Sequence, residues 1–552
     1  MIITTVRRRA APRRACPLWG KRVALRGGRF VRRRAASRRA CPLWGKRDAL
    51  RAVGFGAALA LAAALAGAPI AAQTLRFGLA EDPDVLDPTL ARTFVGRIVF
   101  AALCDKLFDI DEKLAIVPQL AQSYSWSGDG KALTIKVRPG VTFHDGEKLD
   151  AAAVKYNIER HKTMAGSNRR GELALVTGVD VVDPMTARLN LSAPFSPLLA
   201  ALADRSGMMV SPKAAQAAGD KFGAKPVCSG PFRFVERVAQ DRIVLERYPD
   251  YWNKGQIFLE KVTYLPIPDS TVRLANLKSG QLDFIERMSP SDVPALKTDS
   301  RFKISKITEI GYQGITMNVG KSELAKTNPI GRDPRVREAF ELALDRDGIV
   351  QVVMEGEATV GNQWVAPDNP FYAKNVPIPK RDVARAKALL QEAGTPNPTV
   401  TLMTPTTSDA QKIAQVVQAM VKDAGFDVKI QSTEFATSLD LADKGQYEAY
   451  VLAWSGRADP DGNIYSFDAC KQPLNYAGYC KQEIDDLLNK SRTAGDLTER
   501  KKAYDEIAAV VLRDRPIVYL FHRHWLWAYT AKLSGLRTIP DGLVRVQGLK
   551  FN

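Results

Sequence analysis

The sequence has few of the side chains that carry out covalent, metal or nucleotide chemistry. Histidine occurs only four times in 552 residues, at His144, His161, His522 and His524. The motifs H-E-x-x-H, G-x-S-x-G and C-x-x-C are absent, and so is a G-x-x-x-x-G-K-[ST] phosphate loop. The reactions that depend on these motifs are therefore excluded, including ATP hydrolysis by a phosphate loop. Energy for any transport process would have to come from partners.

Acidic residues are scarce only at the N-terminus. The formal net charge is +19, but residues 1–72 hold 17 of the Lys and Arg residues and a single acid, Asp48. The rest of the chain has 62 basic against 59 acidic residues, a net charge of only +3. No run of Lys and Arg with interleaved aromatics follows residue 72, so we expect no nucleic-acid partner.

The basic N-terminus ends in an uncharged segment, "AVGFGAALALAAALAGAPIAA", that runs to Ala72. Basic residues, an apolar stretch and small residues at its end are typical of an export signal, and we predict cleavage after Ala72. A membrane anchor is the alternative, against which Pro69 and the Ala/Gly composition argue. Upstream, "RRACPLWGKR" occurs twice at an offset of 25 residues, so residues 1–72 are predicted to be a basic leader with a duplicated segment.

Only four cysteines follow the leader. Cys470 and Cys480 are close enough in sequence for a local bridge, which leaves Cys104 to pair with Cys228. An exported chain permits these two disulfides, and four buried thiols are the alternative.

The remaining chain alternates strand-like and helix-like segments, which predicts a mixed α/β protein. "ALTIKV" and "RIVLERY" have the composition of strands, whereas 333–354 and 382–394 have the apolar period of helices. In the first helical window Val336, Phe340 and Leu344 mark the core side, with Arg335, Arg337, Glu338 and Glu341 expected in solvent. Gly394 is expected to end the second helix.

The histidines suggest two further hypotheses. His144 and Asp145 in "PGVTFHDG" could be an acid–base pair of an exported hydrolase, although a structural role in the turn before a helix capped by Asp150 is simpler. His522 and His524 alternate on the predicted strand "PIVYLFHRHWLWAY" and could bind a metal or metal chelate, but two ligands make an incomplete site.

Several segments together resemble one family. "LTIKVRPGVTFHDGEKLDAAAVKYNIER", "SGPFRFVERVAQDRIVLERYPDYW", "DPRVREAFELALDRDGIV", "RDVARAKALLQEAG" and "RPIVYLF" are similar to the extracellular solute-binding proteins, family 5, of peptide, nickel and glutathione ABC importers. The resemblance covers almost all of residues 75–545.

This resemblance implies a bilobal periplasmic binding protein of the large three-segment (type II-like) class, with a ligand cleft between the lobes. The implied domains are domain I (73–115, 226–320 and 526–552), domain II (116–225) and domain III (321–525). The implied function is that of a periplasmic receptor that captures a peptide-like or other small polar solute by lobe closure and delivers it to permease subunits. No catalysis and no cofactor are expected, and the receptor is expected to be a monomer.

The resemblance also implies ligand-binding residues. Peptide binders of the family have Trp-x-Ala/Gly-Asp where this chain has Trp454, Gly456 and then Arg457, so the expected acid is replaced by a guanidinium that favours a carboxylate, phosphate or hydroxyl. Asp459 or Asp461 could bind an amine if the loop shifts by two residues. Alternatively, "DPDG" forms a solvent-facing turn in which Arg457 pairs with one of them.

Further wall residues are implied by the same resemblance. Thr93, Phe94, Trp364 and Trp454 are the candidates, because aromatic side chains hold ligands by area and stacking. Core packing is the alternative role for each aromatic.

Overall fold

The computed structural model describes residues 73–552. The basic leader, the duplicated segment, the export signal and the predicted cleavage after Ala72 lie outside the described residues.

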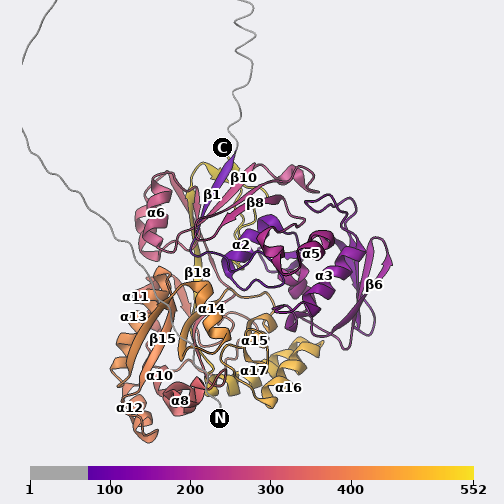
Figure 1. The fold of residues 1–552 in the computed structure, drawn as a ribbon. Helices are drawn as coiled ribbons and strands as arrows, with labels where there is room; N and C mark the ends of the chain where they lie inside the picture. The colour runs from indigo at the N-terminus through magenta and orange to yellow at the C-terminus, as the bar shows by residue number, and fades with distance from the viewer. Residues whose placement is uncertain (1–72) are drawn as a thin grey trace, which may run out of the picture. The chain divides into compact units, whose positions relative to one another are not determined.

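A mixed twelve-stranded sheet runs through the structure, as Figure 1 shows. Its strands, in spatial order, are β16 (Asp427–Thr433), β15 (Thr399–Pro405), β17 (Ala449–Trp454), β13 (Tyr312–Met317), β18 (Ile517–Thr530), β11 (Phe284–Ile285), β1 (Thr74–Leu79), β10 (Lys261–Pro266), β9 (Arg242–Arg247) and β8 (Phe232–Val238), with β12 (Phe302–Thr308) and β14 (Ala358–Val360) also paired to β18. Because β18 has 14 residues, it is long enough to serve two halves of the molecule.

Smaller sheets complete the strand set. An antiparallel four-stranded sheet has the order β4 (Ala121–Trp126), β5 (Ala132–Val137), β7 (Thr186–Leu191) and β6 (Val176–Asp183). Two-stranded ribbons are formed by β2 (Phe108–Ile110) with β3 (Ile116–Pro118) and by β19 (Leu533–Ser534) with β20 (Lys550–Phe551).

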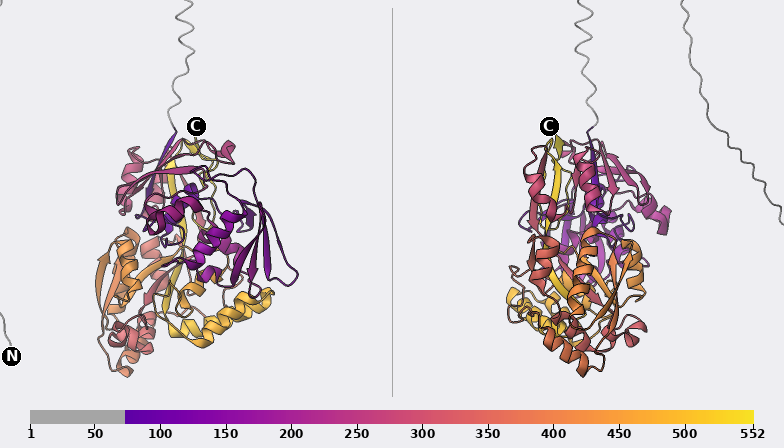
Figure 2. Two further views of the ribbon diagram at one scale, coloured as in Figure 1. Left: turned by 45° about the vertical axis from the view of Figure 1, so that its right-hand side comes forward. Right: turned by 90° about the vertical axis from the view of Figure 1, so that its left-hand side faces the viewer.

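Helices cover these sheets and divide between two lobes. The first lobe holds α2 (Phe94–Leu103), α3 (Ala151–Thr163), α4 (Leu198–Leu202), α5 (Pro212–Ala218), α6 (Ser270–Lys278) and α7 (Val293–Lys297). The second lobe holds α8 (Leu324–Thr327), α9 (Pro329–Arg332), α10 (Pro334–Leu342), α11 (Arg346–Met354), α12 (Val383–Glu392), α13 (Ser408–Lys422), α14 (Phe435–Asp443), α15 (Asp461–Asp468), α16 (Gln482–Thr493) and α17 (Leu497–Asp514). Figure 2 shows the second-lobe helices, in red, orange and gold, gathered in the lower part of the molecule beneath the indigo and magenta segments.

Each lobe has its own buried core. Residues before 308 and after 524 fill the first lobe's cores, which contain Phe77, Leu103 and Trp527. Residues between 312 and 521 fill the second lobe's cores, which contain Phe340 and Tyr450. The predicted mixed α/β, two-lobed architecture is thereby confirmed. The predicted domain boundaries at 115, 225, 320 and 525 stay a prediction, and β18 passes through 525 without a break.

The chain passes between the lobes at two adjacent places, which we call the crossing: Glu309–Gly311, between β12 and β13, and His522–His524, inside β18. The first half of β18 pairs with β13 and β14, and from His524 onward it pairs with β12 and β11. The two crossing segments are hydrogen-bonded, because the Glu309 N–H donates to the Arg523 carbonyl at 3.0 Å.

Local sequence signals mostly predicted these elements. Asp150 caps α3 through a 2.9 Å bond from the N–H of Ala153, and Gly394 follows α12 with a φ of +67°. Among the residues expected in solvent, Arg337 and Glu341 are instead buried. The prediction was wrong for them because Arg337 donates to main-chain carbonyls and Glu341 pairs with Arg346 and Arg515.

Both predicted disulfides are present. Cys104 is bonded to Cys228, which ties α2 to the segment before β8, and Cys470 is bonded to Cys480. In residues 73–552 no helix is long and apolar enough to cross a bilayer.

Candidate functional site

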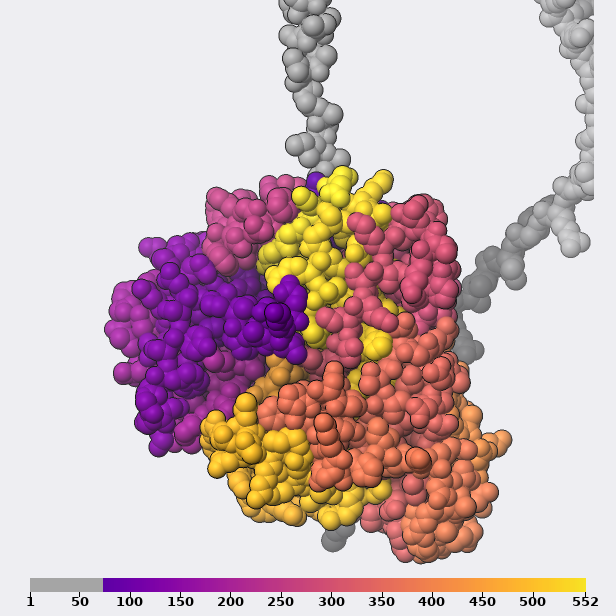
Figure 3. Space-filling model, turned by 180° about the vertical axis from the view of Figure 1, so that it is seen from behind, coloured from indigo at the N-terminus to yellow at the C-terminus, as the bar shows by residue number. Residues whose placement is uncertain are grey.

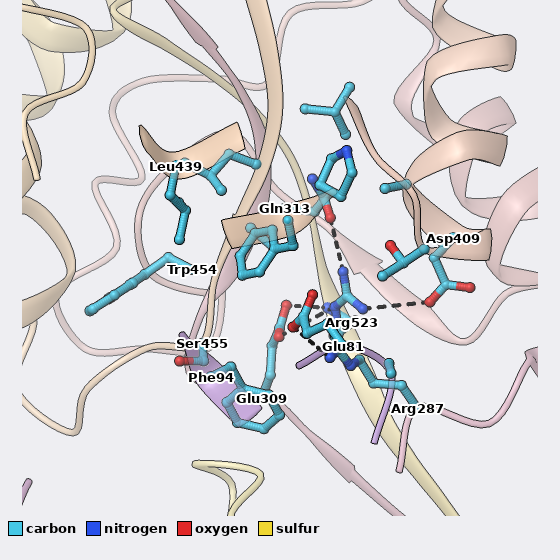
Figure 4. Close-up of a pocket in the computed structure, with 18 of the residues that line it drawn as sticks. Glu81, Phe94, Arg287, Glu309, Gln313, Asp409, Leu439, Trp454, Ser455 and Arg523 are labelled. Carbon is cyan, nitrogen blue, oxygen red and sulfur yellow. Dashed lines mark hydrogen bonds and ion pairs between the residues drawn. The ribbon is translucent and has the colours of Figure 1, made fainter. Parts of the chain in front are cut away.

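A cavity of about 100 Å³ lies beside the crossing and is walled by both lobes. Glu81, Phe94 and Arg287 come from the first lobe, and Asp409 and Trp454 from the second. Figure 4 shows that Trp454 and Leu439 lie at one end and Arg523 and Asp409 at the other. The cavity therefore has an apolar end and a charged end.

The apolar end is built around Trp454 at the end of β17. Its indole N–H donates to the Asn463 side chain at 2.9 Å, and its ring meets Phe467 edge-on at a centroid distance of 4.7 Å. Both partners lie on α15, so this helix fixes the indole orientation. Leu439 on α14 completes this end, which suits the apolar or flat part of a solute.

Phe94 and Trp525 form a stacked pair on the first-lobe side, with centroids 4.5 Å apart and planes inclined by 11°. Both line the cavity. The Arg287 guanidinium lies 5.7 Å from the Phe94 centroid, so the aromatic wall continues directly into the charged end.

The charged end combines side chains from distant parts of the sequence. Arg287 donates to Glu81 at 2.7 Å, and the Arg523 N–H donates to Glu309 at 2.8 Å. Arg523 Nη1 lies 3.7 Å from the Asp409 carboxylate. These five residues were missed by the sequence analysis, although charged residues inside the apolar runs "DFIERM" and "LFHRHWLW" were a possible signal.

Burial governs the titration of two of these acids. It raises the pKa of Glu81 and raises that of Glu309 to about 7, with the neighbouring arginines opposing the shift. Both carboxylates are thus buried where water does not hydrate their negative charge.

Two glycines allow the crossing to lie against the loop after Trp454. A Cβ on Gly311 would be 1.8 Å from the Trp454 carbonyl oxygen, and one on Gly456 would be 2.3 Å from the Ile310 carbonyl carbon. Gly456 also has a φ of +79°, which favours glycine. A small residue after Trp454 is therefore required by close backbone packing on the crossing.

Polar contacts join the lobes around the cavity. Arg92 of the first lobe pairs with Asp440, at 2.6 Å, and with Asp443, both on α14. On the other side the Ser196 N–H donates to the carbonyl of Arg492 at 3.0 Å. Figure 3 shows the gold helices of the second lobe meeting the indigo part of the first. The structure thus has its lobes in contact.

Arg457 does not line this cavity. It is 7 % exposed, lies 4.3 Å behind the Trp454 ring, and pairs across the lobes with Asp204 at 3.4 Å. Burial and the adjacent Arg97 lower the pKa of Arg457 to about 10. The alternative of a solvent-facing turn, in which Arg457 pairs with Asp459 or Asp461, is wrong, because the Arg457 side chain is buried against the first lobe.

Asp459 and Asp461 also have arginine partners. Asp459 receives two hydrogen bonds from Arg500, at 2.8 and 3.0 Å, and Asp461 lies 2.9 Å from Arg492. Together with Arg457 they line a separate recess of about 20 Å³. The ligand contacts predicted for these three residues stay predictions.

The remaining wall candidates divide between cavity and core. Phe94 and Trp454 line the cavity, whereas Thr93 caps α2 through the N–H of Gly96 and is 1 % exposed. Trp364 is fully buried in the second lobe, 6.3 Å from the Tyr504 ring. The structure therefore brings two of the four candidates together.

His144 is held between main-chain groups. Its Nε2 is 2.9 Å from the Gly230 carbonyl, and Nδ1 accepts from the N–H of Cys228. Burial lowers its pKa to about 4. Asp145 accepts from the Ser211 hydroxyl at 2.6 Å, so both side chains are used in tying segments together.

His522 and His524 make separate contacts. His522 Nδ1 lies 2.6 Å from the Gly311 carbonyl, and His524 Nδ1 lies 3.0 Å from Glu357. Over residues 73–552 no three His, Cys, Asp or Glu side chains are grouped to hold a metal ion. The described residues therefore provide no complete set of metal ligands for the metal-carrier hypothesis.

A two-lobed α/β molecule with a cavity at the point where its chain passes between lobes has the architecture of a solute-binding protein. Residues 115–475 match the family model described as "Bacterial extracellular solute-binding proteins, family 5 Middle". The chain belongs to this family, whose members are substrate-binding receptors, and the predicted resemblance is confirmed.

Relatives of the chain bind different solutes. It is 29 % identical over 472 residues to the glutathione-binding protein GsiB of Pectobacterium atrosepticum, covering 83 % of this chain and 90 % of that relative. It matches the periplasmic binding protein DppA of Helicobacter pylori in complex with the peptide STSA (TM-score 0.79, 26 % identity, 87 % and 98 % coverage). A third match is AgaA of A. tumefacien R10 in complex with agropinic acid (TM-score 0.79, 27 % identity, 87 % and 99 % coverage).

Proposed function

We propose that this protein is the periplasmic receptor of an ABC importer, which captures a peptide-like or other small polar solute and delivers it to permease subunits. The cavity at the crossing supports this most strongly, because a solute there would touch both lobes at once. The solutes named for the relatives, glutathione, a tetrapeptide and agropinic acid, are small and polar, as the charged end of the cavity requires. The leader supports export, with cleavage near Ala72, and we propose a monomer without cofactor or catalytic activity.

Capture by closure requires that the solute bind the closed arrangement better than the open one. A ligand that bridges the first-lobe wall at Phe94 and the second-lobe wall at Trp454 meets this requirement, since separation of the lobes would remove one wall. The permease would then recognise the closed form.

Thermal unfolding of the exported protein tests the proposal. Its N-terminus is first defined by mass spectrometry, and glutathione, the peptides STSA and Met-Leu, agropinic acid and a set of sugars are then added in turn. A ligand at 100 times its Kd should add about 2.7 kcal/mol to the free energy of unfolding. If no peptide, amino-acid derivative or sugar in a broad library stabilises the protein, the receptor function is refuted.

A further inference from the structure

The charged end of the cavity has hydrogen-bonding capacity that the protein itself does not use. Glu81 is 5 % exposed, and one of its carboxylate oxygens accepts no hydrogen bond from residues 73–552. Asp409, in the first turn of α13, likewise receives no hydrogen bond from the described chain and has only the 3.7 Å ion pair with Arg523. These acceptors face a cavity, so a solute can reach them.

Unused donors lie beside these acceptors. Arg287 uses Nε and Nη2 for Glu286 and Glu81, which leaves Nη1 without a hydrogen bond to residues 73–552. Arg523 Nη2 donates a hydrogen bond to the Gln313 side chain, while Arg523 Nη1 makes only the 3.7 Å contact with Asp409. Free donors and free acceptors therefore stand next to each other at one end of the cavity.

Acids and guanidiniums occur in nearly equal number in this region. The carboxylic acids are Glu81, Glu286, Glu309 and Asp409, and the guanidiniums are Arg273, Arg287 and Arg523. Burial raises the pKa of Glu309 to about 7, so this acid is only partly ionised near neutral pH. Arg92 is bound to acids of α14 and to Asp84. Buried groups of both charge signs favour a ligand that brings a cation and an anion together.

We propose that the charged end binds an amino-acid-type zwitterion, whose ammonium contacts the free oxygens of Glu81 and Asp409 and whose carboxylate contacts the free nitrogens of Arg287 and Arg523. This deepens the proposed function and rests on it. The remainder of the solute lies toward Trp454 and Leu439, because the apolar end is the other end of the same cavity. Both lobes contribute to the ammonium contact, since Glu81 belongs to the first and Asp409 to the second.

The titration of the buried acids agrees with this assignment. Burial raises the pKa of Glu81 despite Arg287 and Arg523 and in the presence of Glu286, and raises that of Glu309, which faces Arg523 and Arg287. An ammonium beside them would stabilise their charged forms and release protons on binding. A metal ion is a poorer candidate, because no three acids or histidines of residues 73–552 are grouped for it.

Calorimetric titration of the exported protein tests the inference. The probes are glutathione and the dipeptide Met-Leu, each in free, N-acetylated and carboxyl-amidated form. The free forms should bind, and each blocking group should weaken binding roughly ten- to hundred-fold, the loss expected for a charged hydrogen bond in a desolvated site. Glu81→Gln and Asp409→Asn should weaken free probes similarly and leave N-acetylated probes unchanged.

Matched controls separate binding from folding. Asp423→Asn changes an acid at the opposite end of α13 from Asp409, with a side chain 63 % exposed and paired to Arg381 on the surface, and should leave every affinity unchanged. Glu81→Gln keeps an oxygen that can accept from Arg287, so its melting temperature should stay near that of the wild type.

Three results would overturn the proposal that the charged end binds a zwitterion. N-acetylated probes could bind as tightly as free ones, the two variants could behave like Asp423→Asn, or neither free probe could bind at 10 mM while an amine-free compound of the broad library does. In each case the receptor function would stand, since a solute still binds. If no compound binds in either experiment, both proposals fail.

Discussion

Arg92 forms an ionic link between the lobes that gives a quantitative prediction. Its guanidinium is 14 % exposed and pairs with Asp440 and Asp443 on α14, whose side chains are 62 % and 43 % exposed. Exposed ion pairs contribute about 0.2–1 kcal/mol each, so two pairs stabilise the closed arrangement by about 0.4–2 kcal/mol. Arg92→Gln should therefore raise the apparent Kd for a captured solute by roughly 2- to 30-fold.

The fold should tolerate this change. Asp84, the third partner of Arg92, keeps its hydrogen bonds from the main-chain N–H of residue 92 and from the Thr93 hydroxyl, so the start of α2 stays organised. Arg381→Gln is the control, because it removes an ion pair with Asp423 inside the second lobe, at 2.7 Å. Its Kd should equal that of the wild type.

Arg92 also lines the cavity, so a loss of direct ligand contact must be distinguished from a loss of closure. Asp440→Asn weakens the same link from the second lobe and should reproduce part of the effect, as Asp440 is not a wall residue of the cavity. Small-angle scattering of the ligand-free protein should show more open molecules for both variants, and higher salt should weaken binding by the wild type more than by Arg92→Gln. Equal Kd values and equal salt dependence for Arg92→Gln and wild type would refute the link.

Three further predictions use other side chains. Trp454→Phe should weaken solute binding at least several-fold, whereas Trp364→Phe, in the core, should lower the melting temperature and leave the Kd unchanged; the reverse pattern would contradict the assignment of cavity and core. His144→Gln should lower stability through its lost contacts with Gly230 and the Cys228 N–H without changing solute binding, and any hydrolytic activity lost with it would contradict a structural role. Burial raises the pKa of Glu309 to about 7, so the stability that its neutral form contributes is lost as pH rises through 7. The melting temperature should therefore fall more between pH 6 and pH 8 in the wild type than in Glu309→Gln. Parallel plots of melting temperature against pH for the two proteins would exclude the raised pKa.

The elements predicted from sequence were those fixed by local chemistry. Asp150 caps α3 and Gly394 follows α12, because a cap depends on residues within one helical turn. Arg337 and Glu341 were misplaced because an apolar period locates the first packing layer only. A second layer, made here by α9 carbonyls and Arg515, can bury the polar face as well.

The site could not be predicted in the same way. Glu81, Arg287, Asp409 and Arg523 approach one another only because β1, β11, β18 and α13 meet at the crossing. Trp454 was found because a motif of the family contains it. Arg457 was singled out because it follows the glycine of the motif. Its side chain, however, lies behind the Trp454 indole and pairs with Asp204 of the first lobe, so in this arrangement it contacts the other lobe and not the cavity.

Glu309 and Arg523 connect the charged end to the movement of the lobes. Both belong to the crossing, both line the cavity, and the main chain of each bonds to the other residue. A rotation of the lobes must change backbone angles near these residues, because the strands on either side are fixed in separate cores. A charged group bound beside them therefore acts on the segment that bends, while the solute's apolar part acts on the distant wall at Trp454. Arg457 lies behind the Trp454 ring, where it shares Asp204 with Arg97 and Arg205, so the charged groups that line the cavity are those of the crossing, where recognition and closure involve the same residues.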